Sequence, residues 1–237
     1  MLRFVSGSYL LPHPAKAAKG GEDALFINDE LNALGVADGV GGWTLRGIDP
    51  GRYARELLRL TEQAIQAGER DPVSALRQAC DGNRERGSST ACVVILNDDR
   101  LATVNVGDSG FIILREEQVW QSRQITLHSF NFPFQLGEGS PDQPADGVVS
   151  TYQLLPDDLL VIATDGLWDN FFENQVAELA TGESDMDNLA RSLAHQARRN
   201  STDPQRRTPW SGAALGGKLD DIAVIAARVI HVSGNKP

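Results

Sequence analysis

The sequence is poor in the residue types that build zinc sites and disulfide frameworks. Its 237 residues include two cysteines, Cys80 and Cys92, and four histidines. Neither cysteine belongs to a CxxC pattern, and no two histidines have the spacing of paired metal ligands. These features argue against a zinc site or a disulfide scaffold. They favour two small, buried thiols in a reducing compartment.

Long apolar runs and an excess of positive charge are also missing. The densest apolar run, 159–163, is far shorter than the ~18 residues that a membrane-spanning helix needs. The formal net charge of −10 disfavours nucleic acid as a partner, because phosphate backbones select basic surfaces. We therefore expect a cytoplasmic protein that binds neither membrane nor nucleic acid.

Hydrophobic periodicity divides the chain into strands and two pairs of helices. Strands are predicted at 2–11, 23–28, 33–38, 88–97, 100–107, 109–116, 118–122, 147–154, 158–165 and 221–232. Helices are predicted at 49–68, 71–83, 173–181 and 186–200, whereas segments 126–147 and 201–218 read as loops. Two helix pairs can cover both faces of a double sheet, which predicts one α+β layered domain.

Acidic residues recur where apolar strands begin or end. They are Glu22, Asp23, Asp38, Asp108, Asp165, Asp220 and Asp221. Each Asp-Gly taken singly is more typical of a turn than of a ligand site. The recurrence points to a cluster, because a buried acid carries a desolvation cost unless it is paired or bound to a metal. No basic residue directly flanks Asp38 or Asp165.

A cluster of carboxylates is suited to hard cations. Carboxylate and carbonyl oxygens are ligands for Mg²⁺ or Mn²⁺, while zinc prefers histidine and cysteine. The glycine that follows Asp38 leaves the backbone open, so that an ion could approach the carbonyl of Gly39. Carboxylates around two such ions can hold an in-line water and clamp the oxygens of a phosphoryl group.

Six motifs, in order, resemble those of the type 2C metal-dependent serine/threonine protein phosphatases (PPM family). They are 21-GEDA-24, 36-VADGVGGW-43, 88-SSTACVV-94, 104-VNVGDSG-110, 163-ATDGLWD-169 and 217-GKLDDIAVI-225. The resemblance covers essentially the whole chain and looks most like the bacterial and organellar branch. It implies one catalytic domain over 1–237, monomeric, with a four-layer α-β-β-α sandwich of two antiparallel sheets flanked by helix pairs. In a eukaryote the location would be organellar.

The resemblance also implies roles for the acids around two Mn²⁺ or Mg²⁺ ions. Asp38 would bridge both ions, the Gly39 carbonyl would bind one, Glu22 would serve the second, and Asp165 and Asp220 would hold the first. Asp38, Asp165 and Asp220 would thereby be the catalytic residues. The remaining acids would surround this set. Asp23 would hydrogen-bond to a metal-bound water, and Asp108 and Asp169 would bind a third, weaker ion. Asp221 would add charge to the site or cap the last strand.

The implied reaction is hydrolysis of phosphoserine and phosphothreonine in phosphoproteins by direct attack of a water that bridges the metals. No covalent enzyme intermediate is expected, so the two cysteines would have no role. Two further possibilities remain open at this stage. The chain could be an inactive pseudophosphatase that binds phosphoproteins, or it could act on small phosphorylated metabolites.

The sequence departs from the family pattern at three positions, one of which is Asp221 in place of the usual asparagine after Asp220. Val40 stands where many animal members carry a histidine proposed as general acid, so the leaving-group proton would need another source, such as metal-bound water, His13 or His128. Ala18 replaces the phosphate-binding arginine, and Lys16 or Lys19 could supply that charge instead.

Segment 126–147 falls where family members place a mobile flap. Its phenylalanines Phe130, Phe132 and Phe134 could contact a substrate or anchor the loop on the core.

Overall fold

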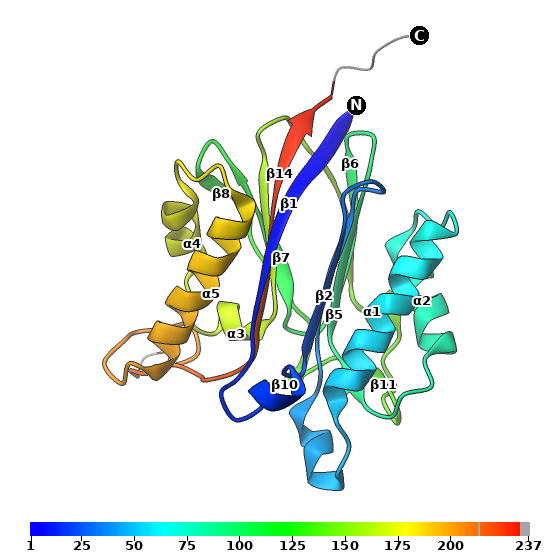
Figure 1. The fold of residues 1–237 in the computed structure, drawn as a ribbon, viewed down its shortest axis with the longest axis vertical. Helices are drawn as coiled ribbons and strands as arrows, with labels where there is room; N and C mark the ends of the chain where they lie inside the picture. Colours follow the sequence, from blue (N-terminus) through cyan, green and yellow to red (C-terminus); the bar gives the residue numbers. More distant parts are fainter. Residues whose placement is uncertain (213, 233–237) are drawn as a thin grey trace.

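Two antiparallel sheets of five strands each form the centre of the molecule (Figure 1). The computed structural model describes residues 1–212 and 214–232. One sheet has the order β1 (Leu2–Leu11), β14 (Ile222–His231), β13 (Leu159–Ala163), β7 (Gly110–Arg115) and β8 (Gln118–Gln121). The other has the order β12 (Val148–Gln153), β6 (Arg100–Val106), β5 (Ala91–Asn97), β3 (Ala33–Asp38) and β2 (Asp23–Asn28).

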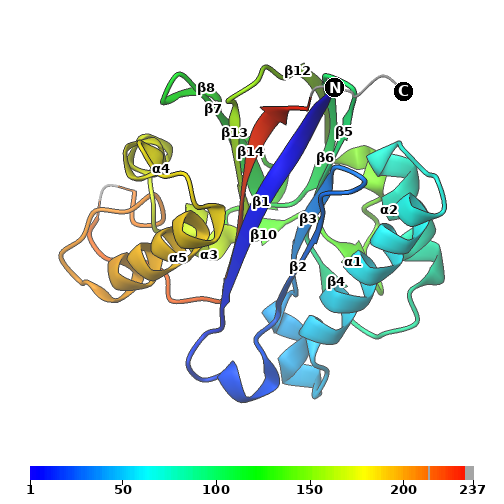
Figure 2. The ribbon, with the colours of Figure 1, turned by 45° about the horizontal axis from the view of Figure 1, so that its top comes forward.

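A helix pair covers the outer face of each sheet (Figure 2). Helices α1 (Pro50–Gln66) and α2 (Pro72–Gly82) lie on the β2–β3–β5 side, and α4 (Glu173–Ala180) and α5 (Met186–Thr202) lie on the β1–β14 side. The predicted four-layer α+β sandwich is therefore confirmed. Within 1–212 and 214–232, no helix has both the length and the apolar character that crossing a membrane requires.

Local capping explains where three of these helices begin. The side chains of Asp49, Asp71 and Asp185 accept hydrogen bonds from backbone N–H groups in the first turns of α1, α2 and α5. Such caps satisfy donors that have no partner inside the helix. Proline follows two of them, at Pro50 and Pro72, where its fixed φ suits the first turn.

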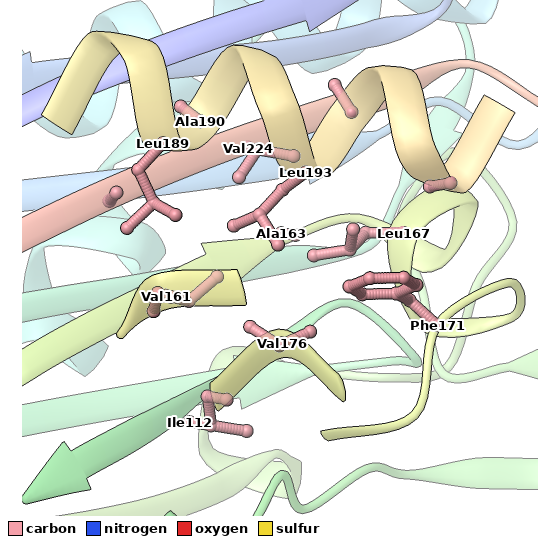
Figure 3. Close-up of a cluster of buried hydrophobic side chains, with 14 of the residues drawn as sticks. Ile112, Val161, Ala163, Leu167, Phe171, Val176, Leu189, Ala190, Leu193 and Val224 are labelled. Carbon is pink, nitrogen blue, oxygen red and sulfur yellow. The ribbon is translucent and has the colours of Figure 1, made fainter. Parts of the chain in front are cut away.

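The core consists of one apolar layer between the sheets and one beneath each helix pair. Figure 3 shows the layer beneath α5, where Leu189 and Leu193 point toward Val161 of β13 and Val224 of β14. These side chains are almost fully buried. Each contributes roughly 1.5–3 kcal/mol relative to an exposed position, and together they fix the strands whose ends carry the acids.

The structure corrects three details of the predicted elements. Strand β13 ends at Ala163, and Asp165 starts a single helical turn, α3 (Asp165–Trp168), because Leu167 N–H bonds back to Thr164 O. The predicted strand 88–97 breaks at Thr90 into β4 (Ser88–Ser89) and β5. Helix α5 runs to Thr202, two residues past its predicted end.

The segment 126–147 is also more regular than the loop that its Pro- and Gly-rich sequence predicts. It contains three short strands, β9 (Leu127–Ser129), β10 (Phe132–Pro133) and β11 (Leu136–Gly137), of which β9 pairs with β10 and β11 pairs with β4. Three 3₁₀ helices, η1 (Ala17–Lys19), η2 (Gly41–Arg46) and η3 (Pro144–Asp146), are also present. Pairing with β4 fastens this segment, hereafter the flap, to the sandwich.

Truncation of the core beneath α5 should destabilise the whole sandwich. Leu193→Ala should lower the free energy of unfolding by about 2–5 kcal/mol, since the side chain is fully buried and a cavity would remain. Urea denaturation followed by circular dichroism measures this loss. Leu179→Ala, at a position 39% exposed on α4, is the matched control and should cost less than about 1 kcal/mol. Equal effects of the two variants would contradict the assignment of this layer as core.

Candidate metal centre

Strand pairing brings the predicted acids to one end of the sandwich. Asp23 at the start of β2 is the direct cross-strand partner of Asp38 at the end of β3. In the other sheet, the end of β13 and the start of β14 lie together, since Ala163 pairs with Val224. Antiparallel neighbours necessarily place the end of one strand beside the start of the next. Acids far apart in sequence therefore meet at one place.

These acids border a cavity of about 470 Å³. Its lining comprises the acids Asp38, Asp108, Asp165 and Asp220, the lysines Lys16 and Lys218, residues 39–42, Thr90 and the flap residues 131–133. Oxygens of Asp38, Asp108 and Asp165 all lie within 4.8 Å of one another, close enough to coordinate one ion. The structure brings Asp38, Asp108, Asp165 and Asp220 together around this cavity, and Lys16 also belongs to its lining.

Burial and mutual repulsion disfavour the charged forms of these carboxylates. Burial is the main cause that raises the pKa of Asp38 well above its ordinary value, and the charges of Asp165 and Asp23 raise it further. Burial likewise raises the pKa of Asp108 to about 6 and that of Asp169 to about 7, with Asp165 as the next cause in both. A cation beside these groups would relieve both penalties.

Several carboxylate oxygens also have no hydrogen-bond partner among the described residues. They are Asp23 Oδ1, Asp108 Oδ1 and Asp165 Oδ1, all buried. An unpaired buried acceptor is unfavourable unless something else satisfies it. Together with the oxygen-only donor set, these atoms fit a hard divalent cation such as Mg²⁺ or Mn²⁺.

A hydrogen-bonded threonine positions Asp23. Thr164 Oγ1 donates to Asp23 Oδ2 at 2.7 Å and accepts from Ala223 N at 2.9 Å. All of these atoms are buried, so the contact links β2 of one sheet to β13 and β14 of the other. Thr164 therefore has a structural role in this site.

Two glycines allow backbones to meet behind the acids. A Cβ on Gly39 would lie 2.7 Å from Pro50 C and 2.8 Å from Glu22 O. A Cβ on Gly166 would lie 1.9 Å from Asp221 O. Real Cβ atoms do not approach so closely, so the glycines next to Asp38 and Asp165 are needed for packing as well as for access.

Two lysines neutralise part of the negative charge. Lys16 Nζ lies 2.7 Å from Glu22 Oε2, 3.0 Å from Asp221 Oδ2 and 3.6 Å from Asp220 Oδ1. Lys218 Nζ contacts Asp165 and lies 3.1 Å from Asp220 Oδ2. Burial opposes the charge of each lysine, but these carboxylates outweigh it and raise both pKa values.

Sequence analysis did not single out Lys218. Its signal was the spacing to Asp220, because residues two apart in an extended segment point to the same side. Lys19, by contrast, is exposed in η1 and is not among the described residues that line the cavity.

The histidines do not stand beside the acids as proton donors. His13 is tied to Asp221 through its backbone N–H, and His128 Nε2 lies 3.0 Å from Asp142 Oδ2 while its ring stacks on Phe134. Neither belongs to the described lining of the cavity, whereas Val40 does.

The cysteines are equally unsuited to catalysis. Burial raises the pKa of Cys80 to about 12 and that of Cys92 beyond its ordinary range. These shifts agree with the expected absence of a cysteine-based covalent step.

The flap phenylalanines divide between the two roles considered from the sequence. Phe134 packs against the core, which is the anchoring role. Phe132 is 50% exposed and lines the cavity, and Phe130 is 78% exposed with its ring centroid 5.2 Å from that of Trp210. The flap is anchored at Phe134, and its Phe132 ring lies at the acid-lined cavity.

Comparison with known proteins gives a consistent result. The family model described as Stage II sporulation protein E (SpoIIE) matches residues 30–230. Probable protein phosphatase 2C 55 of Arabidopsis thaliana is 43% identical over 243 residues, which cover 96% of this chain and 52% of that protein. Probable protein phosphatase 2C 26 of the same plant is 32% identical, over 94% of this chain and 83% of that protein. The chain spans little more than half the length of several curated relatives that it matches.

Solved structures show the same relationship. The X-ray structure of the photosystem II phosphatase PBCP has a TM-score of 0.91 and 32% identity, and the match covers 95% of this chain and 98% of that one. The match in sequence and fold extends over nearly the whole chain, and this protein belongs to the protein phosphatase 2C (PPM) family.

Proposed function

We propose that residues 1–237 form a single catalytic domain of a Mg²⁺- or Mn²⁺-dependent serine/threonine protein phosphatase, monomeric and acting on phosphoproteins. The observation that carries the proposal is the convergence of Asp38, Asp108 and Asp165, with unpaired buried oxygens, in one cavity. Family membership supports this reading. The relatives that share the fold are named as phosphatases.

The ligand set proposed for two ions is the one that the motifs imply. Glu22, Asp38, the Gly39 carbonyl, Asp165 and Asp220 would hold the ions, with Asp23, Asp108, Asp169 and Asp221 around them. A solved catalytic domain of the serine threonine protein phosphatase PstP, described as a complex with 2 manganese ions, has the same fold at 16% identity. That precedent supports manganese as a ligand of this chain.

The bound ions would lower the pKa of a water and neutralise charge on the phosphoryl oxygens. The chain's own residues would fix the geometry. Thr164 holds Asp23 across the two sheets, and Gly39 and Gly166 allow the acid-bearing backbones to approach. Lys16 lines the cavity with its side chain 31% exposed, and we assign it to a phosphoryl oxygen of the substrate. Lys19 would bind a phosphoryl oxygen only after a movement of η1.

The inactive alternative has no support beyond Val40 and Ala18. A degenerate member would be expected to lose acids, and every carboxylate of the implied ligand set is present in the sequence. The choice between phosphoproteins and small phosphorylated metabolites depends on surfaces such as the flap. A panel of phosphopeptides and phosphometabolites separates the two.

Hydrolysis of p-nitrophenyl phosphate should require added Mn²⁺ and should stop with EDTA. Asp38→Ala/Asp165→Ala should reduce the rate by about 1,000-fold or more, since metal ions supply several kcal/mol of transition-state stabilisation. Glu178→Ala, an exposed change on α4, is the control and should leave the rate unchanged. Full activity in the double variant, or metal-independent activity, would refute the proposed function.

The valine in 36-VADGVGGW-43 predicts how the leaving group obtains its proton. If this chain relies on a proton source other than residue 40, Val40→His should change kcat on a phosphoserine peptide by less than about 10-fold. An effective new general acid would raise kcat by roughly 10²–10⁴-fold. Measurement of kcat over a range of pH for both proteins distinguishes the two outcomes. A gain of 100-fold or more would show that the native site lacks a proton donor.

The metal-free protein should lose stability as pH rises from about 4 to about 7. The folded-state pKa values of Asp108 and Asp169, about 6 and about 7, lie above the ordinary value of 3.8, so the native state binds more protons than the unfolded state across this window. Thermal denaturation in EDTA at several pH values measures the trend. Asp169→Asn should flatten it, and Mn²⁺ should remove it. Rising stability over the same window would contradict the assignment.

A further inference from the structure

Lys218 contacts acids that Lys16 does not, although both lysines approach Asp220. Its Nζ contacts Asp165 and lies 3.1 Å from Asp220 Oδ2 and 3.3 Å from Asp169 Oδ2. The side chain is 21% exposed, and its charged end lies among three carboxylates. This is the arrangement of a coordinated cation, with an ammonium in the central position.

The backbone of Lys218 is held by a buried asparagine. Lys218 N donates to Asn170 Oδ1 at 2.9 Å, and Asn170 Nδ2 donates to Lys218 O at 2.7 Å. Asn170 is 1% exposed, and Asn200 Nδ2 donates to its carbonyl at 2.9 Å. A Cβ on Gly217 would lie 2.4 Å from Asn170 Oδ1, so glycine is required before the lysine. Lys218 is therefore anchored to α5 and α3, unlike a solvated surface lysine.

An aromatic ring lies close to the ammonium. Lys218 Nζ lies 5.2 Å from the centroid of Trp210, a distance at which a cation is attracted to the ring face. Trp210 N in turn donates to Asp169 O at 2.9 Å, which fixes the ring beside the same acid. The ammonium therefore lies among carboxylates on one side and next to an indole ring on the other.

The carboxylate of Asp169 calls for positive charge. Ions held by Glu22, Asp38 and Asp220 would leave it without a direct counter-charge. Among the described residues, Lys218 Nζ makes an ion pair with Asp169 Oδ2 at 3.3 Å.

We propose that the Lys218 ammonium is a built-in cation that takes the place of a third metal ion beside Asp165 and Asp169. This inference rests on the proposed function, which supplies two ions at Asp38. The chain then binds two divalent ions, and the cation beside Asp169 is part of the polypeptide. The positive charge beside Asp169 is then present at any concentration of free metal ion.

The experiment counts Mn²⁺ ions per chain by equilibrium dialysis with metal analysis, on the full chain. The wild type should bind two. Lys218→Ala removes both the charge and the stem, and it should bind three. Lys218→Arg, the matched control, keeps a cation in place and should bind two. Asp169→Asn added to Lys218→Ala should return the count from three to two, because the extra ion would lose its outer ligand.

The outcomes separate this inference from the proposed function. Two ions in both the wild type and Lys218→Ala would overturn the inference alone. This outcome includes tighter binding of the same two ions by the variant, which would mean that these ions displace the lysine in the wild type. Three ions in the wild type would also overturn it. No binding by the wild type would overturn the proposed function as well.

A second measurement does not depend on the folding of any variant. Crystals of the wild-type protein soaked in Mn²⁺ should show anomalous peaks near Asp38 and none between Asp108 and Asp169, with Lys218 Nζ still within hydrogen-bond distance of Asp169. A peak between Asp108 and Asp169, or a lysine turned out to solvent, would refute the built-in cation.

Discussion

Repulsion among buried carboxylates at one end of a β-sandwich is the constraint around which this molecule is arranged. Oxygens of Asp38, Asp108 and Asp165 lie within 4.8 Å of one another, in surroundings that disfavour their charge. An unfolded chain would separate these groups, so the cluster opposes folding unless cations are present. The apolar layers between and beneath the two sheets provide the opposing stability. The acid cluster thus lowers the stability of the folded state, and the apolar layers compensate for this loss.

The scaffold holds the acids through contacts that leave little freedom. Glycine at 39 and at 166 lets three backbones meet behind the carboxylates, and Thr164 joins the two sheets at the same level. Because strands on either side continue into the core, small shifts of the acids would disturb packing far from the cavity. The flap is different, since Phe132 lines the cavity while half exposed and Phe130 is exposed against Trp210.

The sequence predicted the sandwich and the acid cluster well because both depend on local patterns. Strand β1 follows from alternation over residues 2–11, and the acids follow from motifs at strand ends. The single turn α3 was missed, since a helix of four residues is set by tertiary contacts of Thr164 with Ala223 and of Gly166 with Asp221. The contacts of Lys218 depend on Asn170, which is distant in sequence and carries no recognisable signal. Features that depend on burial and on contacts between residues distant in sequence could not be predicted from local sequence patterns.

Tethered and free cations suit different parts of such a site. A metal ion can bind water and lower its pKa, which an ammonium cannot do, but its presence depends on supply. A lysine is always present, and holding it in place requires only the ordering of its own side chain. Lys16 contacts the cluster at Glu22 and Asp221, and Lys218 contacts it at Asp165 and Asp169. The cavity between them, bordered by Asp38 and Val40, is left for the ions and the phosphoryl group. The positions of the lysines thus limit where metal chemistry can occur within a larger acidic patch.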